Sequence, residues 1–417
     1  MRRSSRLISL AALAAHPALA APPPEPPAQE PPARLEVRGA ERTATSTFEV
    51  LLPRPAPAHY TSAELAEFER RLNNLGIFDE VSVAREPGVI VVVVREKWTL
   101  IPTIDFAIGH PLIDSYAMLG VTDYNFLGTA SQLAVRAYRK ERGFGAEVAF
   151  NEHVYGRNRW ARGANAAYDT AQLRFADGSR WTLTSASGAL WFTSPPVFSE
   201  HLNYEVGVLY SREDVSDVVG SNHPEDTHHV ASSMMFTWDQ FRWDDLVPSG
   251  LRFTFSLTSG MLAGPSLAQL SDKADFGLQA ALPLSADAVL MVRGEAAVAS
   301  RGNPNLGFLL GGIEGVRGLE DGYYRNWLQT YWNVELRHSS RLSSRWAVQS
   351  VLFSDSALFE QLDSDGGRGA GGRALSFGYG GRLIPTWLAN LMLRWDFAHL
   401  TLPRNGWAAQ FGLSQYF

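Results

Sequence analysis

Cysteine is absent from the 417 residues of this chain, which excludes disulfide bonds, thiolate zinc sites and cysteine nucleophiles. Beyond the N-terminus, no apolar run reaches the roughly 18 residues that a membrane-spanning helix needs. Neither sign of charge is in large excess, because 37 basic and 43 acidic side chains leave a net charge of −6. A multi-pass helical membrane protein is therefore excluded, and no nucleic-acid partner is indicated.

Aromatic residues and glycine are plentiful instead, with Trp 12, Tyr 13, Phe 22 and Gly 36. Few long helical patterns accompany them. The strands of a membrane β-barrel alternate apolar and polar residues, so such a sequence averages to moderate hydropathy. The composition therefore favours β-structure with an aromatic girdle.

The first 20 residues have the pattern of a secretory signal peptide. Three arginines precede a short apolar run at residues 7–15, and Ala18 and Ala20 form a small-x-small cleavage site. Residues 21–33 follow as a proline-rich spacer, which we expect to be extended rather than folded. The chain is therefore expected to leave a bacterial cytoplasm.

Residues 34–97 predict a small α/β domain with the element order β-α-α-β-β. The second helix begins at the capping box Thr61-Ser62-Ala63-Glu64, and Leu65, Phe68 and Leu72 follow at helical spacing. The segment from Leu72 to Val81 resembles the leucine, leucine-glycine, aromatic, acidic, valine segment of a POTRA domain. The resemblance implies a strand edge that holds an unfolded polypeptide client by β-augmentation. The candidate edge residues are Val81, Val83, Val91 and Val93.

Residues 98–417 contain alternating segments of about ten residues that are broken by turn residues. At about 20 residues for each strand and its connection, this length predicts a 16-stranded antiparallel outer-membrane β-barrel. The long gaps at 215–227, 261–273, 300–325 and 356–373 all follow odd-numbered strands. This regularity predicts that they are outer loops and that the 34–97 domain lies in the periplasm. A large soluble β-sandwich or propeller is the alternative.

The last strand carries a second indication of the outer membrane. Trp407, Ala409, Phe411, Leu413 and Phe417 share one parity along the chain. A terminal aromatic residue on such a strand resembles the sorting signal of bacterial outer-membrane proteins. We take Phe411, Leu413 and Phe417 as its residues.

A glycine-rich segment from Gly311 to Leu319 contains a single arginine, within Val316-Arg317-Gly318. Taken alone it is an ordinary loop with a solvated arginine. Two later segments, 333–337 and 353–357, and the turn at 239–250 accompany it. Together they resemble the superfamily of BamA, TamA and the two-partner secretion transporters, with this chain as a single-POTRA member.

The resemblance implies that the loop enters the barrel lumen and that Arg317 meets acidic residues there. Matched by motif, Asp355 and Glu335 are those acids. Leu319 stands where the family has an aromatic residue, and Ala357 stands where it has glycine. These departures weaken the docking of the loop and the bend of the strand but keep all three charges.

The resemblance implies two related functions: insertion of other β-barrel proteins, or translocation of a polypeptide across the outer membrane. The first and last strands would then form a separable seam. A passive pore or structural barrel, and lipid transport between membranes, are the alternatives. The implied partners are outer-membrane lipids, an unfolded or secreted polypeptide and periplasmic accessory proteins.

Other chemistry is scarce in the sequence. His223, His228 and His229 lie on or beside a predicted outer loop, where solvated side chains are a better explanation than a metal site. Serine, histidine and aspartate are present, but no G-x-S-x-G elbow organises them. We therefore expect no catalytic residues, no metal and no cofactor.

Overall fold

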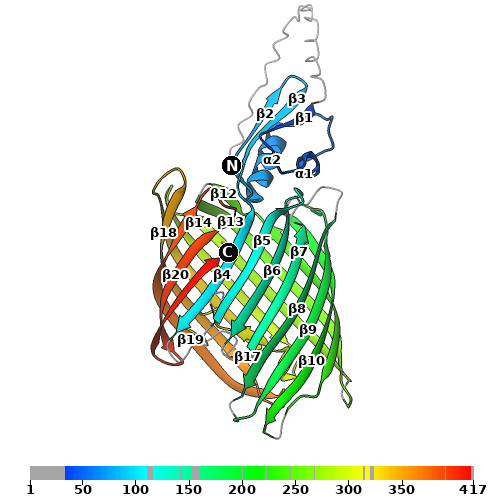
Figure 1. Cartoon of the computed structure of the whole chain (residues 1–417), viewed down its shortest axis with the longest axis vertical. Coiled ribbons are helices and arrows are strands. Elements are labelled where there is room, and N and C mark those ends of the chain that lie inside the picture. The colour runs from blue at the N-terminus through cyan, green and yellow to red at the C-terminus, as the bar shows by residue number, and fades with distance from the viewer. Residues whose placement is uncertain are drawn as a thin grey trace, which may run out of the picture.

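The computed structural model describes residues 33–109, 116–140, 143–152, 160–175, 177–199, 201–220, 223–244, 246–266, 268–312, 315–319, 324–389 and 391–414. It consists of a small N-terminal α/β region at one end of a closed β-barrel (Figure 1). The predicted signal peptide and residues 21–32 of the spacer lie outside the described residues. None of the described helices is long and apolar enough to cross a membrane.

The N-terminal α/β region has the predicted element order. Its elements are β1 (Arg34–Arg38), α1 (Thr45–Leu51), α2 (Ser62–Asn74), β2 (Phe78–Glu86) and β3 (Val89–Glu96). The sheet order is β1-β3-β2, with β1 parallel and β2 antiparallel to β3. The predicted capping box starts α2, since the Thr61 side chain accepts from the Glu64 backbone N–H and Glu64 accepts from that of Thr61.

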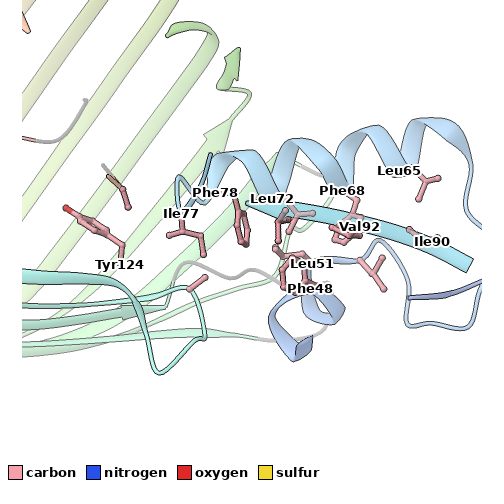
Figure 2. Packing of buried hydrophobic residues seen from close by; sticks show 14 of the residues in the cluster. Phe48, Leu51, Leu65, Phe68, Leu72, Ile77, Phe78, Ile90, Val92 and Tyr124 are labelled. Carbon is pink, nitrogen blue, oxygen red and sulfur yellow. The ribbon is translucent and has the colours of Figure 1, made fainter. Parts of the chain in front are cut away.

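The apolar face of α2 packs onto the sheet and α1. Phe68 and Leu72 lie against Phe48, Ile90 and Val92, and all five are fully buried (Figure 2). The same cluster continues into the barrel through Ile101, Tyr124 and Ala389. The α/β region is therefore packed on the barrel by a shared core.

The barrel comprises 16 long antiparallel strands and two three-residue strands, β12 and β16. The long strands are β4 (Leu100–Gly109), β5 (Tyr116–Phe126), β6 (Ser131–Lys140), β7 (Gly143–Glu152), β8 (Ala161–Arg174), β9 (Arg180–Thr193), β10 (Leu202–Val219), β11 (Thr227–Asp239), β13 (Val247–Ala263), β14 (Ala268–Pro283), β15 (Ala288–Ala299), β17 (Tyr324–Arg341), β18 (Trp346–Leu362), β19 (Arg368–Pro385), β20 (Met392–Leu402) and β21 (Gly406–Ser414). The short ones are β12 (Arg242–Asp244) and β16 (Phe308–Leu310). The predicted strand number is confirmed.

Side chains alternate between the lumen and the outer surface, as the two-residue period of a strand requires. In β20, Arg394, Asp396 and Ala398 are buried, whereas Leu393 is exposed and Phe397 is partly exposed. Outward positions elsewhere carry exposed apolar side chains such as Leu190 and Phe192 of β9. This division of polar and apolar faces is that of a membrane barrel.

Three of the predicted outer loops are wrong in extent, because strands continue into them. β10 continues to Val219, β13 and β14 are separated only by residues 264–267, and β18 continues to Leu362. The strands extend beyond the boundaries that the sequence pattern predicts, because the ladder is made by the backbone. The gap at 300–325 is a true loop, containing η1 (Pro304–Leu306) and β16.

The α/β region rests on three turns at its end of the barrel, which we call near-side turns; connections at the other end are far-side loops. At the β5–β6 turn, Thr47 donates to the Gly128 carbonyl (3.0 Å). Arg70 and Asn74 of α2 both donate to the Phe241 carbonyl, between β11 and β12 (3.1 Å each). Trp98 forms a parallel bridge with Leu388, between β19 and β20. These turns lie on both sides of the β21–β4 junction and opposite it, so the region spans the barrel mouth.

Candidate functional site: the loop inside the lumen

The predicted loop motif lies inside the barrel. Val316 and Arg317 are fully buried, and Gly318 adopts φ +87°, in the left-handed region that favours glycine. Gly315 passes so close to Gly311 that a Cβ atom would lie 2.6 Å from the Gly311 oxygen. A tight turn, with Leu319 N–H donating to Val316 O (3.2 Å), presents the arginine to the wall. Ile313 and Glu314 lie outside the described residues.

Arg317 contacts both acids that the sequence predicts as its partners. Its Nε and Nη2 donate to the two oxygens of Asp355 at 2.8 and 2.6 Å, and its backbone N–H donates to Oδ2 at 3.0 Å. Its Nη1 donates to Glu335 Oε1 at 2.5 Å. Two parallel N–H···O bonds to one carboxylate are the fork geometry that arginine provides and lysine does not.

Four further charged residues, which motif matching did not find, complete a cluster around this arginine. They are Arg337 of β17, Arg382 of β19, and Arg394 and Asp396 of β20, all buried. Arg337 donates to Glu335 (2.6 Å), and Arg382 and Arg394 each donate to Asp396 at 2.6 Å. The sequence does hold an indication of them, because charged residues two positions apart on a barrel strand lie on the same face.

The cluster joins one loop to four consecutive strands, β17 to β20. It contains four guanidinium groups and three carboxylates, each nearly excluded from solvent. Asp396 lies 3.7 Å from Arg317, so the loop arginine is within ion-pair distance of all three acids. Buried charges are tolerated only when they are paired and hydrogen-bonded. The arrangement therefore fixes the loop at one place on the wall.

Apolar contacts surround this cluster. The Phe353 ring lies beneath the Arg317 guanidinium, whose carbon is 3.5 Å from the ring centroid. Val316 and Leu319 belong to a buried cluster with Tyr331, Ala357, Phe359 and Leu400. Leu319, the residue in place of the family's aromatic, therefore still packs against the barrel wall.

The candidate client edge needs a correction. Val81 and Val83 lie on β2, which is an edge strand, but Val91 and Val93 lie on β3, the central strand. A hairpin alone would leave β3 free on one side, but β1 pairs with that side from Arg34↔Val89 to Arg38↔Val93. The free edges of the sheet are therefore β1 and β2.

The remaining candidate residues, those of the C-terminal sorting signal and the histidines, do not come together in one site. Phe411 stacks edge-on against Phe397 at 6.0 Å, Leu413 is at the end of β21, and Phe417 lies outside the described residues. His228 and His229 are adjacent in β11 and bond different partners, Tyr210 (2.8 Å) and Ser271 (2.5 Å). Within the described ranges, no group of three or more acidic or histidine side chains is arranged to hold a metal.

Among the described residues, the junction that closes the barrel, between β21 and β4, has the fewest register pairs of any two neighbouring long strands. Five residue pairs join them, compared with eight for β4–β5 and nine for β20–β21. The last pair is Gly412↔Asp105, although β4 extends back to Leu100 and β21 onward to Ser414. Among the described residues, the near-side part of β4 is therefore not in register with β21.

A cavity of about 800 Å³ lies between the α/β region and the barrel. Leu51 and Asn74 line it from the α/β region, and Tyr124, Phe241, Arg252 and Leu391 line it from the barrel. Its wall mixes aromatic, aliphatic and charged side chains.

Comparisons with known proteins agree with this architecture. A family model described as the Omp85 superfamily domain matches residues 125–398. CdiB from Acinetobacter baumannii superposes with a TM-score of 0.64 at 13% identity, covering 93% of this chain and 74% of that one. CdiB from Escherichia coli gives 0.61 at 13% identity (92% and 76%). BamA from Haemophilus ducreyi lacking POTRA domains 1–3 gives 0.54 at 15% identity (92% and 84%). No curated protein matches the sequence. At these identities the structures establish the shared fold.

Proposed function

Because this chain belongs to the Omp85 superfamily of outer-membrane barrels, we propose that it inserts client β-barrel proteins into the outer membrane through the β21–β4 seam. The observation that carries this proposal is the five-pair register of the seam. Unpaired backbone groups in lipid cost several kcal/mol each, so residues 100–104 of β4, which have no register partner among the described residues of β21, would favour pairing with an incoming strand.

The charge cluster supports a lateral route. It ties the loop to β17–β20, so the wall beside the seam stays rigid while the seam itself is weakly joined. The described loop residues occupy the lumen and the α/β region spans the mouth, which disfavours a passive pore. The proposed role is assembly or transport, with no catalytic step.

Translocation of an unfolded polypeptide through the lumen is the second candidate. The cavity at the mouth favours it, because its mixed lining suits an extended chain of varied side chains. In either case we propose that the α/β region is a POTRA domain in the periplasm. Its β2 edge, with Val81 and Val83, would bind the client by strand addition.

A disulfide across the seam distinguishes the two routes. Ile108 and Ala409 are register partners, so the Ile108→Cys/Ala409→Cys variant joins the strands in a chain with no native cysteine. We expect the oxidised variant to lose insertion of a client barrel into liposomes and the reduced variant to regain it. The matched control is Leu119→Cys/Ala137→Cys, a partner pair of β5 and β6. Full insertion with the seam locked would contradict lateral insertion and favour the lumen.

The proposed orientation has its own test. Ser62 of α2 and both Ser266 and Asp365 of the far-side loops are exposed. With an impermeant maleimide on intact cells, we expect cysteine variants at 266 and 365 to be labelled and the Ser62→Cys variant to be labelled only after the outer membrane is opened. Labelling of position 62 on intact cells would reverse the orientation.

A further inference from the structure

Large apolar side chains stand exposed at the tips of the near-side turns. Five turns carry one each: Leu127, Phe198, Leu284, Leu342 and Trp387. Their exposure runs from 43% for Trp387 to 104% for Phe198. Turn tips normally carry glycine, proline and small polar residues, so a repeated apolar tip indicates a partner that is not water.

Counted along the chain in steps of two, the tip residues fall on the same outward-facing positions as the exposed residues of the adjoining strands. Leu342 follows Val334 and Leu336 of β17 at even positions, and Trp387 follows Phe377 and Tyr379 of β19 at odd positions. The exposed apolar surface of these strands therefore runs on into the turns. Since the outward face of the barrel contacts lipid, the tips extend that same interface beyond the strands.

The turn beneath α2 shows the opposite arrangement. Phe241 and Leu246 flank β12, and both are buried. Phe241 O accepts from Arg70 and Asn74 of α2, so here the α/β region covers the turn. The apolar residues of the turn beneath α2 are thus buried, whereas the tips of the five other described near-side turns are exposed, including those of the β5–β6 and β19–β20 turns that the α/β region also contacts.

Two of the tips also hold an unfavourable backbone conformation. Leu127 has φ +55° and Phe198 has φ +60°, a region that glycine and asparagine occupy most easily. A left-handed backbone is unfavourable for any residue with a side chain. In water, a bulky apolar residue at such a position would be unfavourable both for its backbone conformation and for its exposed apolar surface. Burial of the side chain in an apolar medium removes the second of these costs.

Beside the seam, an exposed tryptophan lies next to an arginine. Trp98, just before β4, is exposed and points outward like Leu100. Its backbone N–H donates to Trp387 O at 3.2 Å. The Arg42 guanidinium lies over the Trp98 ring, 5.7 Å from its centroid. Tryptophan with an adjacent cation is the chemistry of a membrane interface, where the ring meets the acyl boundary and the cation meets phosphate.

We propose that these six residues, the turn-tip ring (Leu127, Phe198, Leu284, Leu342, Trp387 and Trp98), insert into the interface of the bilayer leaflet nearest the α/β region. The occupant is phospholipid, because the ring continues the lipid-facing surface of the barrel. The ring holds the near-side rim inside the leaflet and brings Arg42 and the base of the α/β region to the headgroups. This inference rests on the membrane location of the barrel and is independent of the proposed client.

The absence of cysteine makes a direct test possible. Leu127→Cys, Phe198→Cys and Leu342→Cys variants are labelled with an environment-sensitive fluorophore and reconstituted in phospholipid nanodiscs, where both faces are open to solvent. The controls are two exposed polar residues of near-side turns: Ser343→Cys in the turn of Leu342, and Asp287→Cys in the turn of Leu284. We expect the tip probes to show blue-shifted emission, loss of signal with lipids that carry a quencher near the headgroup, and several-fold weaker quenching by iodide than the controls.

Two results would overturn the proposal. Iodide quenching of the tip probes equal to that of the controls, with no effect of the lipid quencher, would place the ring in water. Tip probes that are open to iodide in nanodiscs yet protected in native envelopes would assign the ring to a protein partner. The seam disulfide tests only client insertion, and the probes at the turn tips test only contact with lipid. Either proposal can therefore be refuted without refuting the other.

Discussion

Replacing Arg317 with alanine is expected to free the lumen loop while leaving a folded barrel in the membrane. The substitution removes two side-chain donors from Asp355 and one from Glu335, both fully buried. Removing one partner of a buried ion pair costs about 3–5 kcal/mol. Glu335 still accepts from Arg337, whereas Asp355 then accepts from the loop backbone, Asn333 and Ser376. We therefore expect most of the lost stability to come from Asp355. Protease cleavage within 311–319 measures loop release, and client insertion measures function.

Two further variants define the cause of that effect. Arg317→Lys should rescue poorly, because an ammonium group cannot donate two parallel bonds to Asp355 while reaching Glu335. Arg317→Ala combined with Asp355→Asn should recover part of the lost stability, since the buried carboxylate charge that has lost its arginine is removed. Alanine at the exposed Arg139 of β6 is the control and should leave loop cleavage unchanged. A loop equally protected in the wild type and in Arg317→Ala would refute anchoring by this arginine.

Replacing Asp396 with alanine is expected to destabilise the wall beside the seam more than it affects the loop. Asp396 accepts from Arg382 and Arg394 at 2.6 Å each, and both arginines are buried. Two guanidinium groups would lose their shared acceptor, so we expect a loss of about 3–5 kcal/mol. The measurement is the temperature at which the barrel unfolds in detergent. Loop cleavage should change little because Asp355 still holds Arg317.

An exposed pair of the same type gives the comparison. Arg212 and Asp214 of β10 form an ion pair at 3.0 Å with both side chains largely solvated. Asp214→Ala should cost at most about 1 kcal/mol, because water screens such pairs. Asp396→Asn should be milder than Asp396→Ala, since the amide oxygen still accepts one bond. Equal losses for Asp396→Ala and Asp214→Ala would show that the buried cluster does not stabilise the wall.

The sequence determines the features of this protein that depend on local pattern. The two-residue period of the strands is a property of the backbone, so 16 strands and their alternate connections follow from the chain itself. The capping box at Thr61 and the glycine at 318 are likewise local, because each requires a particular residue at one backbone position. Arg317, Asp355 and Glu335 were found through a family motif, and parity confines the two acids to one face of their strands.

Tertiary structure decides what depends on register and closure between distant segments. Arg382, Arg394 and Asp396 join the Arg317 cluster only because the β19–β20 register aligns Arg382 with Arg394. β3 is central rather than an edge because β1, more than 50 residues earlier, pairs with it. The short seam and the burial of Phe241 beneath α2 arise only when the barrel closes and the α/β region docks. These contacts are set by the geometry of the closed sheet, which no local period in the sequence encodes.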